Sequence, residues 1–221
     1  MRPSTVAHPG PTTPWLLYWV ARAWMFVFRW DVEGEPPQHP KGVVIAAPHT
    51  TNWDLPHMLA ASFIFRFRIS WLGKDSLFRP PYGWLMRLLG GVPVDRSAAR
   101  GLVQQASDML VEADQLMIAV PPSGTRSKRD AWKSGFYWIA HSAQVPVICG
   151  YLDYGRRRAA LGYSFVPTGD VDADMEKVRA FYRDVRGKFP ALESTIRLKE
   201  ERMLPDHGQP PSEDGDDPGP A

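Results

Sequence analysis

Apolar and polar positions follow a regular order along most of this chain. From Lys41 onward, short apolar runs alternate with stretches that place apolar side chains on one face of a helix, as in α/β domains. The pattern predicts strands at residues 43–47, 69–73, 92–95, 115–120, 145–151 and 161–166. It predicts helices at residues 55–65, 82–89, 97–112, 132–142 and 174–187. We therefore expect a single α/β domain whose mixed, mainly parallel sheet is covered by helices.

The stretch 14–30 is different, because it is apolar and aromatic with Arg22 and Arg29 inserted. It is too short and too interrupted to span a bilayer, which takes about 20 apolar residues. Aromatic rings combined with arginines suit an amphipathic helix that lies in the membrane interface. A helix packed on the core in the ordinary way is the alternative.

Length and composition divide the chain into four parts. A chain of 221 residues can bury the core of one domain, which we expect at residues 31–203. Residues 1–13 are predicted to be flexible and lack the layout of a secretory signal. The interfacial helix at 14–30 follows. Residues 204–221 are rich in proline, glycine and acid, so we expect a disordered acidic tail.

The charge of the chain is unevenly distributed. The net charge is +2, but the residues after Leu204 carry five acids and no lysine or arginine, which leaves +7 on the rest. A basic body suits partners that carry phosphate, such as anionic lipid, coenzyme A, acyl carrier protein or nucleic acid. The single cysteine, Cys149, excludes an internal disulfide and fits the cytosol or a cytosolic membrane face.

A histidine and an aspartate follow the first predicted strand. His49 and Asp54 are five residues apart, so on one continuous helix they would point about 140° apart. Pro48 favours extended backbone before it, Asn52 and Asp54 are good N-cap residues, and Pro56 fits only the first turn of a helix. The break should therefore fall between His49 and Asp54. The carboxylate can then reach back and orient the imidazole, which could take a proton from an alcohol. A surface histidine near a helix cap would show the same spacing.

Two later segments could bind a phosphate. Arg96 ends a strand-like unit just before a predicted helix, where backbone N–H groups and a guanidinium can hold an anion. After the next strand, a glycine-containing loop offers a hydroxyl, amides and a guanidinium at Gly124, Thr125 and Arg126. Taken alone, Asp95 and Arg96 also fit a surface pair that caps a helix, and the later loop also fits a solvated basic turn. The spacing of a Walker loop is absent, so nothing supports nucleotide hydrolysis.

His57 raises the question of a metal site with His49 and Asp54. No H-E-x-x-H pattern or cysteine-rich partner accompanies it, so we expect no metal and interpret His57 as an ordinary helix histidine. Recognition signatures for nucleic acid are missing as well, so we expect no nucleic-acid partner.

Taken together and in this order, the segments resemble the lysophosphatidate (1-acylglycerol-3-phosphate) acyltransferase family of glycerolipid acyltransferases. That family is marked by an N-H-x4-D block, a block ending in Asp-Arg or a similar arginine, an F-P-E-G-T-R-S block and a V-P-V-I-P strand. This chain has P-H-x4-D at 48–54, V-D-R at 94–96, V-P-P-S-G-T-R-S at 120–127 and V-P-V-I at 145–148. The resemblance covers roughly residues 40–170.

The resemblance implies an acyltransferase domain at 31–203 with His49 as general base and Asp54 as its partner. It implies that the acceptor's phosphate is bound by Arg96, Gly124, Thr125 and Arg126. The expected reaction moves a fatty acyl group from acyl-CoA or acyl carrier protein, a co-substrate and not a bound cofactor, to the hydroxyl of a lysophosphatidate-like glycerolipid. The protein would be peripheral or monotopic on the cytosolic, anionic face of a membrane, in phospholipid biosynthesis or remodelling.

One departure from the family pattern concerns the acceptor site. Ser123 occupies the position of the third block's usual glutamate. Losing that anion leaves the base intact, so we expect altered acceptor choice or slower turnover. A noncatalytic lipid-binding relative that kept the scaffold and lost turnover with the glutamate is the alternative.

Overall fold

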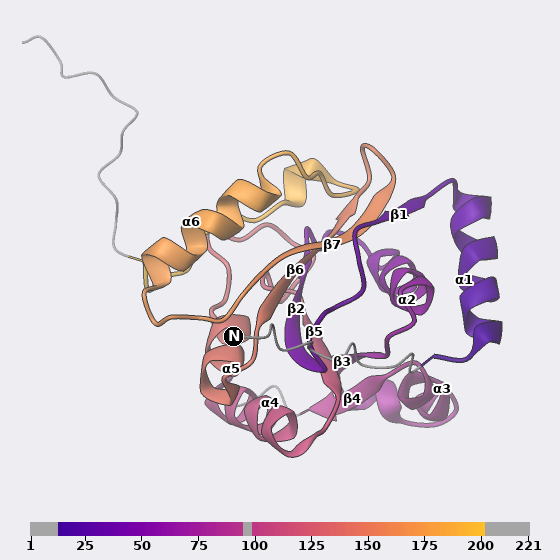
Figure 1. The fold of residues 1–221 in the computed structure, drawn as a ribbon, viewed down its shortest axis with the longest axis horizontal. Coiled ribbons are helices and arrows are strands. Elements are labelled where there is room, and N and C mark those ends of the chain that lie inside the picture. The colour runs from indigo at the N-terminus through magenta and orange to yellow at the C-terminus, as the bar shows by residue number, and fades with distance from the viewer. Residues whose placement is uncertain (1–12, 95–98, 202–221) are drawn as a thin grey trace, which may run out of the picture.

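The structure is a computed structural model, and residues 13–94 and 99–201 are described. Its centre is a seven-stranded sheet with the strand order β1-β7-β6-β2-β5-β3-β4 (Figure 1). The strands are β1 (Asp31–Glu33), β2 (Lys41–Ala47), β3 (Ile69–Lys74), β4 (Gly91–Val94), β5 (Leu116–Val120), β6 (Val147–Asp153) and β7 (Arg158–Phe165). The helices are α1 (Trp15–Phe28), α2 (Asp54–Ile64), α3 (Gly83–Leu88), α4 (Ala99–Glu112), α5 (Gly135–Ala143) and α6 (Val171–Tyr182), with 3-10 turns η1 (Asp75–Phe78) and η2 (Pro190–Leu192).

Neighbouring strands pair in parallel except β6 and β7, which form an antiparallel hairpin. The central strand β2 lies between β5 and β6, and both of its faces are covered. This explains why its sequence is a nearly continuous apolar run, since alternation marks only strands with one wet face. The predicted α/β class with a mixed, mainly parallel sheet is confirmed.

Helices cover both faces of the sheet (Figure 1). On one face, α4, α5 and α6 enclose a core that includes Ile45, Ile118 and Phe136. On the other face, α2 and the η1–α3 segment pack around Trp71 and Met117. Helix α1 lies outside α2 and forms a further layer on that side. The molecule therefore has one side on which α1 is outermost and one side formed by α4, α5 and α6.

Most element boundaries agree with the prediction, and the largest shift is at α6. The predicted helix 174–187 runs from Val171 to Tyr182, because Asp170 caps its start by accepting a hydrogen bond from the Ala173 N–H at 3.2 Å. The residues after Tyr182 leave the helix. Strand β1 was missed because its three residues are mostly exposed and polar, at the edge of the sheet. Residues 95 and 97–98 of two predicted elements lie outside the described residues, as do 1–12 and 202–221.

The α1–α2 contact is built around a buried histidine, His57. Trp30 stacks on its ring with centroids 4.5 Å apart, and the Trp24 indole N–H donates to its Nδ1 at 3.2 Å. Since Nδ1 accepts this bond, the imidazole is neutral. Burial lowers the pKa of His57 to about 4, and the nearby Asp54 charge opposes this only in part. His57 is thus a buried helix histidine that joins the first two helices.

This histidine should make the protein sensitive to mild acid. The pKa of His57 is about 6.5 in the unfolded chain and about 4 in the folded one, so the unfolded chain binds more protons between these values. The free energy of unfolding should therefore fall as the pH decreases from 6.5 towards 4, by as much as about 2–3 kcal/mol. Urea denaturation at a series of pH values measures this loss.

His57→Gln is the matched control, because its amide oxygen can still accept the Trp24 hydrogen bond but cannot be protonated. Its unfolding free energy should depend less on pH over the same range. An equal pH dependence in the two proteins would contradict the assignment of the acid sensitivity to His57.

Candidate active site

A histidine and a carboxylate meet where β2 ends and α2 begins. His49 Nδ1 lies 2.9 Å from Asp54 Oδ2, so the two side chains meet across the loop, as the prolines predicted. A carboxylate only accepts hydrogen bonds, so the neutral imidazole carries its proton on Nδ1. The Nε2 lone pair is then free to take a proton from a substrate. With about a fifth of its side chain exposed, His49 is accessible to one.

Asp54 is surrounded by donors. Its Oδ2 also accepts the backbone N–H groups of Thr50 at 3.0 Å and Thr51 at 3.1 Å, and its Oδ1 accepts the Tyr154 hydroxyl at 2.8 Å. The residue is 6% exposed and stands in the first turn of α2, where the helix dipole favours a negative charge. The ionised carboxylate is therefore stable although it is buried.

Tyr154 was not predicted as a site residue. It lies in the turn between β6 and β7, and its ring packs edge-on against Trp30 with centroids 4.9 Å apart. Burial and the adjacent Asp54 raise the pKa of the Tyr154 phenol, so the hydroxyl keeps its proton and donates it. No local motif marks this residue, because its partner is 100 positions away in the sequence.

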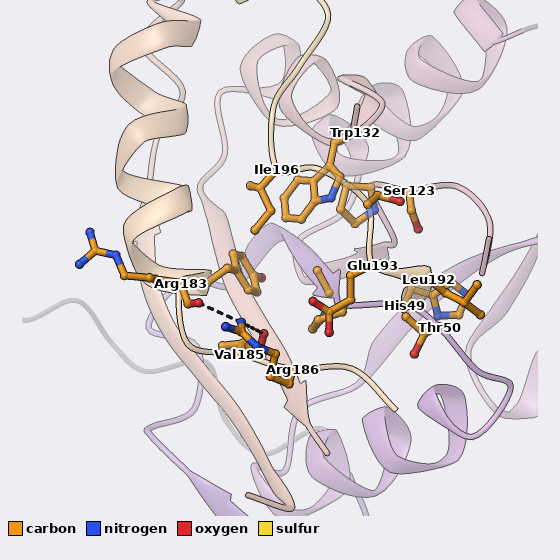
Figure 2. A pocket seen from close by; sticks show the side chains of 15 residues that line it. His49, Thr50, Ser123, Trp132, Arg183, Val185, Arg186, Leu192, Glu193 and Ile196 are labelled. Carbon is orange, nitrogen blue, oxygen red and sulfur yellow. Dashed lines mark hydrogen bonds between the residues drawn. The ribbon is translucent and has the colours of Figure 1, made fainter. Parts of the chain in front are cut away.

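A cavity with a volume of about 140 Å³ lies beside His49. Its lining comes from three segments: the loop after β2, the loop after β5 and the chain that follows α6 (Figure 2). The lining residues are Ala47, Pro48, His49, Thr50, Pro122, Ser123, Trp132, Tyr182, Arg183, Val185, Arg186, Leu192, Glu193, Ser194 and Ile196. Polar groups thus share the cavity with apolar side chains, as a site for an amphiphilic molecule requires.

The chain after α6 is held against the histidine loop. The Phe189 N–H donates to Thr50 Oγ1 at 3.3 Å, and Gly187 packs closely against the same threonine. Glu193 accepts the Gly187 N–H at 2.6 Å and lines the cavity together with His49. The sequence pattern predicts a helix up to residue 187, so it does not indicate this segment or its carboxylate.

The predicted phosphate residues are only partly at the cavity. Ser123 lines it and is buried, with its hydroxyl donating to the Thr125 carbonyl at 2.6 Å. Gly124, Thr125 and Arg126 continue this loop but do not line the cavity, and Arg126 is exposed. Arg96 lies outside the described residues. The structure therefore brings Ser123, at the start of this loop, to the same cavity as His49 of the His49–Asp54 pair, which we call the dyad.

Further cations lie near the loop and the cavity. The exposed Lys133 packs over Gly124, and its N–H donates to the Pro122 carbonyl at 2.8 Å. On the far wall, the Arg186 guanidinium donates to the carbonyls of Arg183 and Val185, while the Arg183 guanidinium points away from Glu193 (Figure 2). None of these residues belongs to a motif, and a lysine or arginine without one is usually solvated, so the sequence does not mark them.

Cys149 offers no alternative nucleophile, since burial raises the pKa of its thiol to about 12. Within residues 13–94 and 99–201, no three His, Cys, Asp or Glu side chains come together in a way that could hold a metal ion.

More than half of the chain matches a known protein family. Residues 29–152 match the family model described as Acyltransferase. A curated relative, the 1-acyl-sn-glycerol-3-phosphate acyltransferase of Streptococcus pneumoniae, is 27% identical over 147 residues, which cover 60% of this chain and 53% of the relative. The chain thus spans about half the length of that relative.

Among solved structures, the chain is similar to the 1-acyl-sn-glycerophosphate acyltransferase PlsC of Thermotoga maritima, with 20% identity and a TM-score of 0.49 over 76% of this chain and 74% of the other. The matched residues 29–152 run from before β1 to Leu152, the last residue but one of β6, and include His49, Asp54 and Ser123. Because the family model matches more than half of the sequence, this chain belongs to the Acyltransferase family.

Proposed function

We propose that the chain is an O-acyltransferase that moves a fatty acyl group from an acyl thioester to the hydroxyl of a lysophosphatidate-like glycerolipid. The observation that carries this proposal is the His49–Asp54 contact of 2.9 Å at a cavity, in a chain of this family. The thioester would be acyl-CoA or acyl carrier protein, and the product would belong to phospholipid biosynthesis or remodelling.

In the proposed mechanism His49 is the general base. Its Nε2 takes the proton of the acceptor hydroxyl as that oxygen attacks the thioester carbonyl, while Asp54 stabilises the imidazolium. When the tetrahedral intermediate collapses, the C–S bond breaks and the new C–O bond remains. The proton then passes from His49 to the departing thiolate. No acyl-enzyme is needed, because the donor is already an activated ester.

The acceptor's phosphate would be held beside the dyad by the loop after β5. We assign it to Gly124, Thr125 and Arg126 together with Arg96, and we add Lys133 because it packs on Gly124. Backbone N–H groups and cations are the usual ligands of a phosphate monoester.

We further propose that α1 lies in the interface of a cytosolic, anionic membrane surface. Its outward side chains are large and exposed: Trp15, Leu16, Trp19, Val20, Phe26 and Val27. Its inner residues Ala21 and Met25 pack on α2. Across the described ranges, no helix is long and apolar enough to span a bilayer. An apolar outer face above a packed inner face favours a helix that lies on the membrane.

A noncatalytic lipid-binding relative is the second candidate, and Ser123 in place of glutamate favours it. Against it stands the oriented pair of His49 and Asp54, since a binding module has no use for a buried carboxylate held on an imidazole by several donors.

Replacing His49 tests the proposal directly. His49→Ala should lower kcat for acyl transfer by about 10²–10⁴, because the acceptor hydroxyl loses its base. The measurement uses labelled acyl-CoA or acyl carrier protein with a panel of lysophospholipids. His39→Ala, which changes an exposed histidine outside this cavity, should retain full activity. Lipid binding without transfer in the unmodified protein would instead support the second candidate.

Tyr154 should act as a positioning residue for Asp54. Tyr154→Phe keeps the ring against Trp30 but removes the donor to Oδ1, so kcat should fall about tenfold with little change in KM. The free energy of unfolding should fall by about 1–3 kcal/mol. Tyr151→Phe on the neighbouring strand removes a hydroxyl that bonds to the exposed Glu33 and should change neither value. An unchanged kcat in Tyr154→Phe would refute the role.

The serine at position 123 should control acceptor choice. The cavity already holds the Glu193 carboxylate, and two carboxylates in one site repel each other. We therefore expect Ser123→Glu to raise kcat/KM for lysophosphatidate more strongly in a Glu193→Gln background than in the unmodified chain. Ser123→Gln, with the same shape and no charge, serves as the control. Identical kinetics on lysophosphatidate in all these proteins would exclude a role for position 123.

A further inference from the structure

A second group of exposed apolar side chains lies outside α1. Within residues 75–88, which contain η1 and α3, Leu77, Tyr82, Trp84 and Leu88 are each at least half exposed. Elsewhere in the described chain, outside α1, the large exposed apolar residues are Trp53, Val111, Val166, Phe189 and Leu192, so no other segment of this length contains as many. Single exposed residues of this kind are ordinary, but these four lie within twelve positions of one short segment, and we refer to them as the patch.

The backbone that carries this patch is firmly held. Phe78, Met86 and Leu89 point inward and pack around Trp71. The Trp71 indole N–H donates to the Leu89 carbonyl at 3.0 Å, and Gly83 fits so closely against the Phe78 backbone that a Cβ there would clash. Because the inward side chains hold the segment in place, Leu77, Tyr82, Trp84 and Leu88 are kept on its outer surface.

The patch lies on the same side of the sheet as α1. Residues of η1, α3 and α2 share one core cluster, and α1 packs on α2 from outside. Figure 1 shows α1 and α3 at one flank of the molecule, away from α4, α5 and α6. In addition, η1 follows the carboxyl end of β3. Strands β3, β5 and β2 are parallel, so their carboxyl ends lie on the same side of the sheet, and η1 is on the side where His49 follows β2.

The charges around both elements favour an anionic lipid surface over a neutral protein partner. Segments 13–30 and 65–88 contain seven lysines and arginines and a single acid, Asp75. Asp75 is paired with Arg79 at 3.7 Å. Arg66 connects the two segments, since its guanidinium lies 4.0 Å from the centre of the Trp15 ring and donates to the Thr13 carbonyl. By contrast, α6 on the opposite side carries three acids and two bases.

We propose that residues 75–88 form a second membrane-docking surface that acts together with α1 on an anionic leaflet. Tryptophan and tyrosine prefer headgroup depth, and arginine stems can lie along apolar surface with their charge at the phosphates. Docking at two places would fix the tilt of the domain relative to the membrane. The carboxyl ends of the parallel strands, where His49 lies, would then face the lipid. The inference rests on the proposed membrane location and extends it to a second element.

Vesicle binding tests this surface. The full chain is mixed with vesicles of phosphatidylcholine and phosphatidylglycerol at a 3:1 ratio, or of phosphatidylcholine alone, and the bound fraction is measured by co-sedimentation. The double variant Trp84→Ser/Leu88→Ser should bind the anionic vesicles at least tenfold more weakly. Val111→Ser, which makes the same kind of change at an exposed position of α4, should bind like the unmodified protein.

Leu77→Ser, in η1, provides an independent test if the double variant is destabilised, and should weaken binding severalfold. Unchanged vesicle binding in both η1–α3 variants would overturn the proposal. It would also be overturned if the unmodified chain formed dimers and the variants lost dimer formation but kept vesicle binding. The assay contains no acyl donor, so it measures vesicle binding independently of acyl transfer. His49 lies outside residues 75–88, so His49→Ala should bind the vesicles like the unmodified protein. Docking without any acyl transfer would therefore refute the proposed function and leave the docking surface standing.

Discussion

The site depends on how a buried carboxylate is kept charged. Asp54 can remain ionised away from water only because donors surround it, and those donors come from different parts of the fold. Two are backbone N–H groups of its own loop, one is the His49 ring, and one is the Tyr154 hydroxyl from the β6–β7 turn. Each bond to a charged group counts for more than a neutral one. The orientation of the imidazole therefore follows from the sheet that brings these segments together.

The same few residues link the site to the outer helix. His57 lies one turn after Asp54 on α2, and it is enclosed by Trp24, Trp30 and Tyr154. Trp30 touches both His57 and Tyr154, and Tyr154 bonds Asp54. A continuous set of contacts thus runs from α1, which we propose lies on the membrane, to the Asp54 carboxylate that contacts the His49 ring. Since packed aromatic rings deform little, these contacts fix the position of α1 relative to His49 and Asp54.

The cavity beside the dyad combines features that the family motifs do not describe. Its far wall is the chain after α6, which contributes Glu193 and is fastened to Thr50. The Ser123 hydroxyl is used inside its own loop, where it donates to Thr125. The negative charge in this cavity therefore comes from a segment beyond the matched region 29–152. In the acyl transfer that we propose, acceptor choice would depend on how that segment is held, and the motif residues alone would not determine it.

Local patterns in the sequence predicted the α/β class, most helices and strands, and the meeting of His49 with Asp54, because these depend on neighbouring residues and on proline geometry. These local patterns could not reveal that Tyr154, Glu193 and Lys133 lie near the site. They also could not reveal the exposed face of η1 and α3. Those depend on the order in which parallel strands assemble and on which helix faces the sheet leaves uncovered. Such contacts join residues far apart in the chain, and a single sequence contains no signal for them, because their chemistry arises only when the sheet brings the segments together.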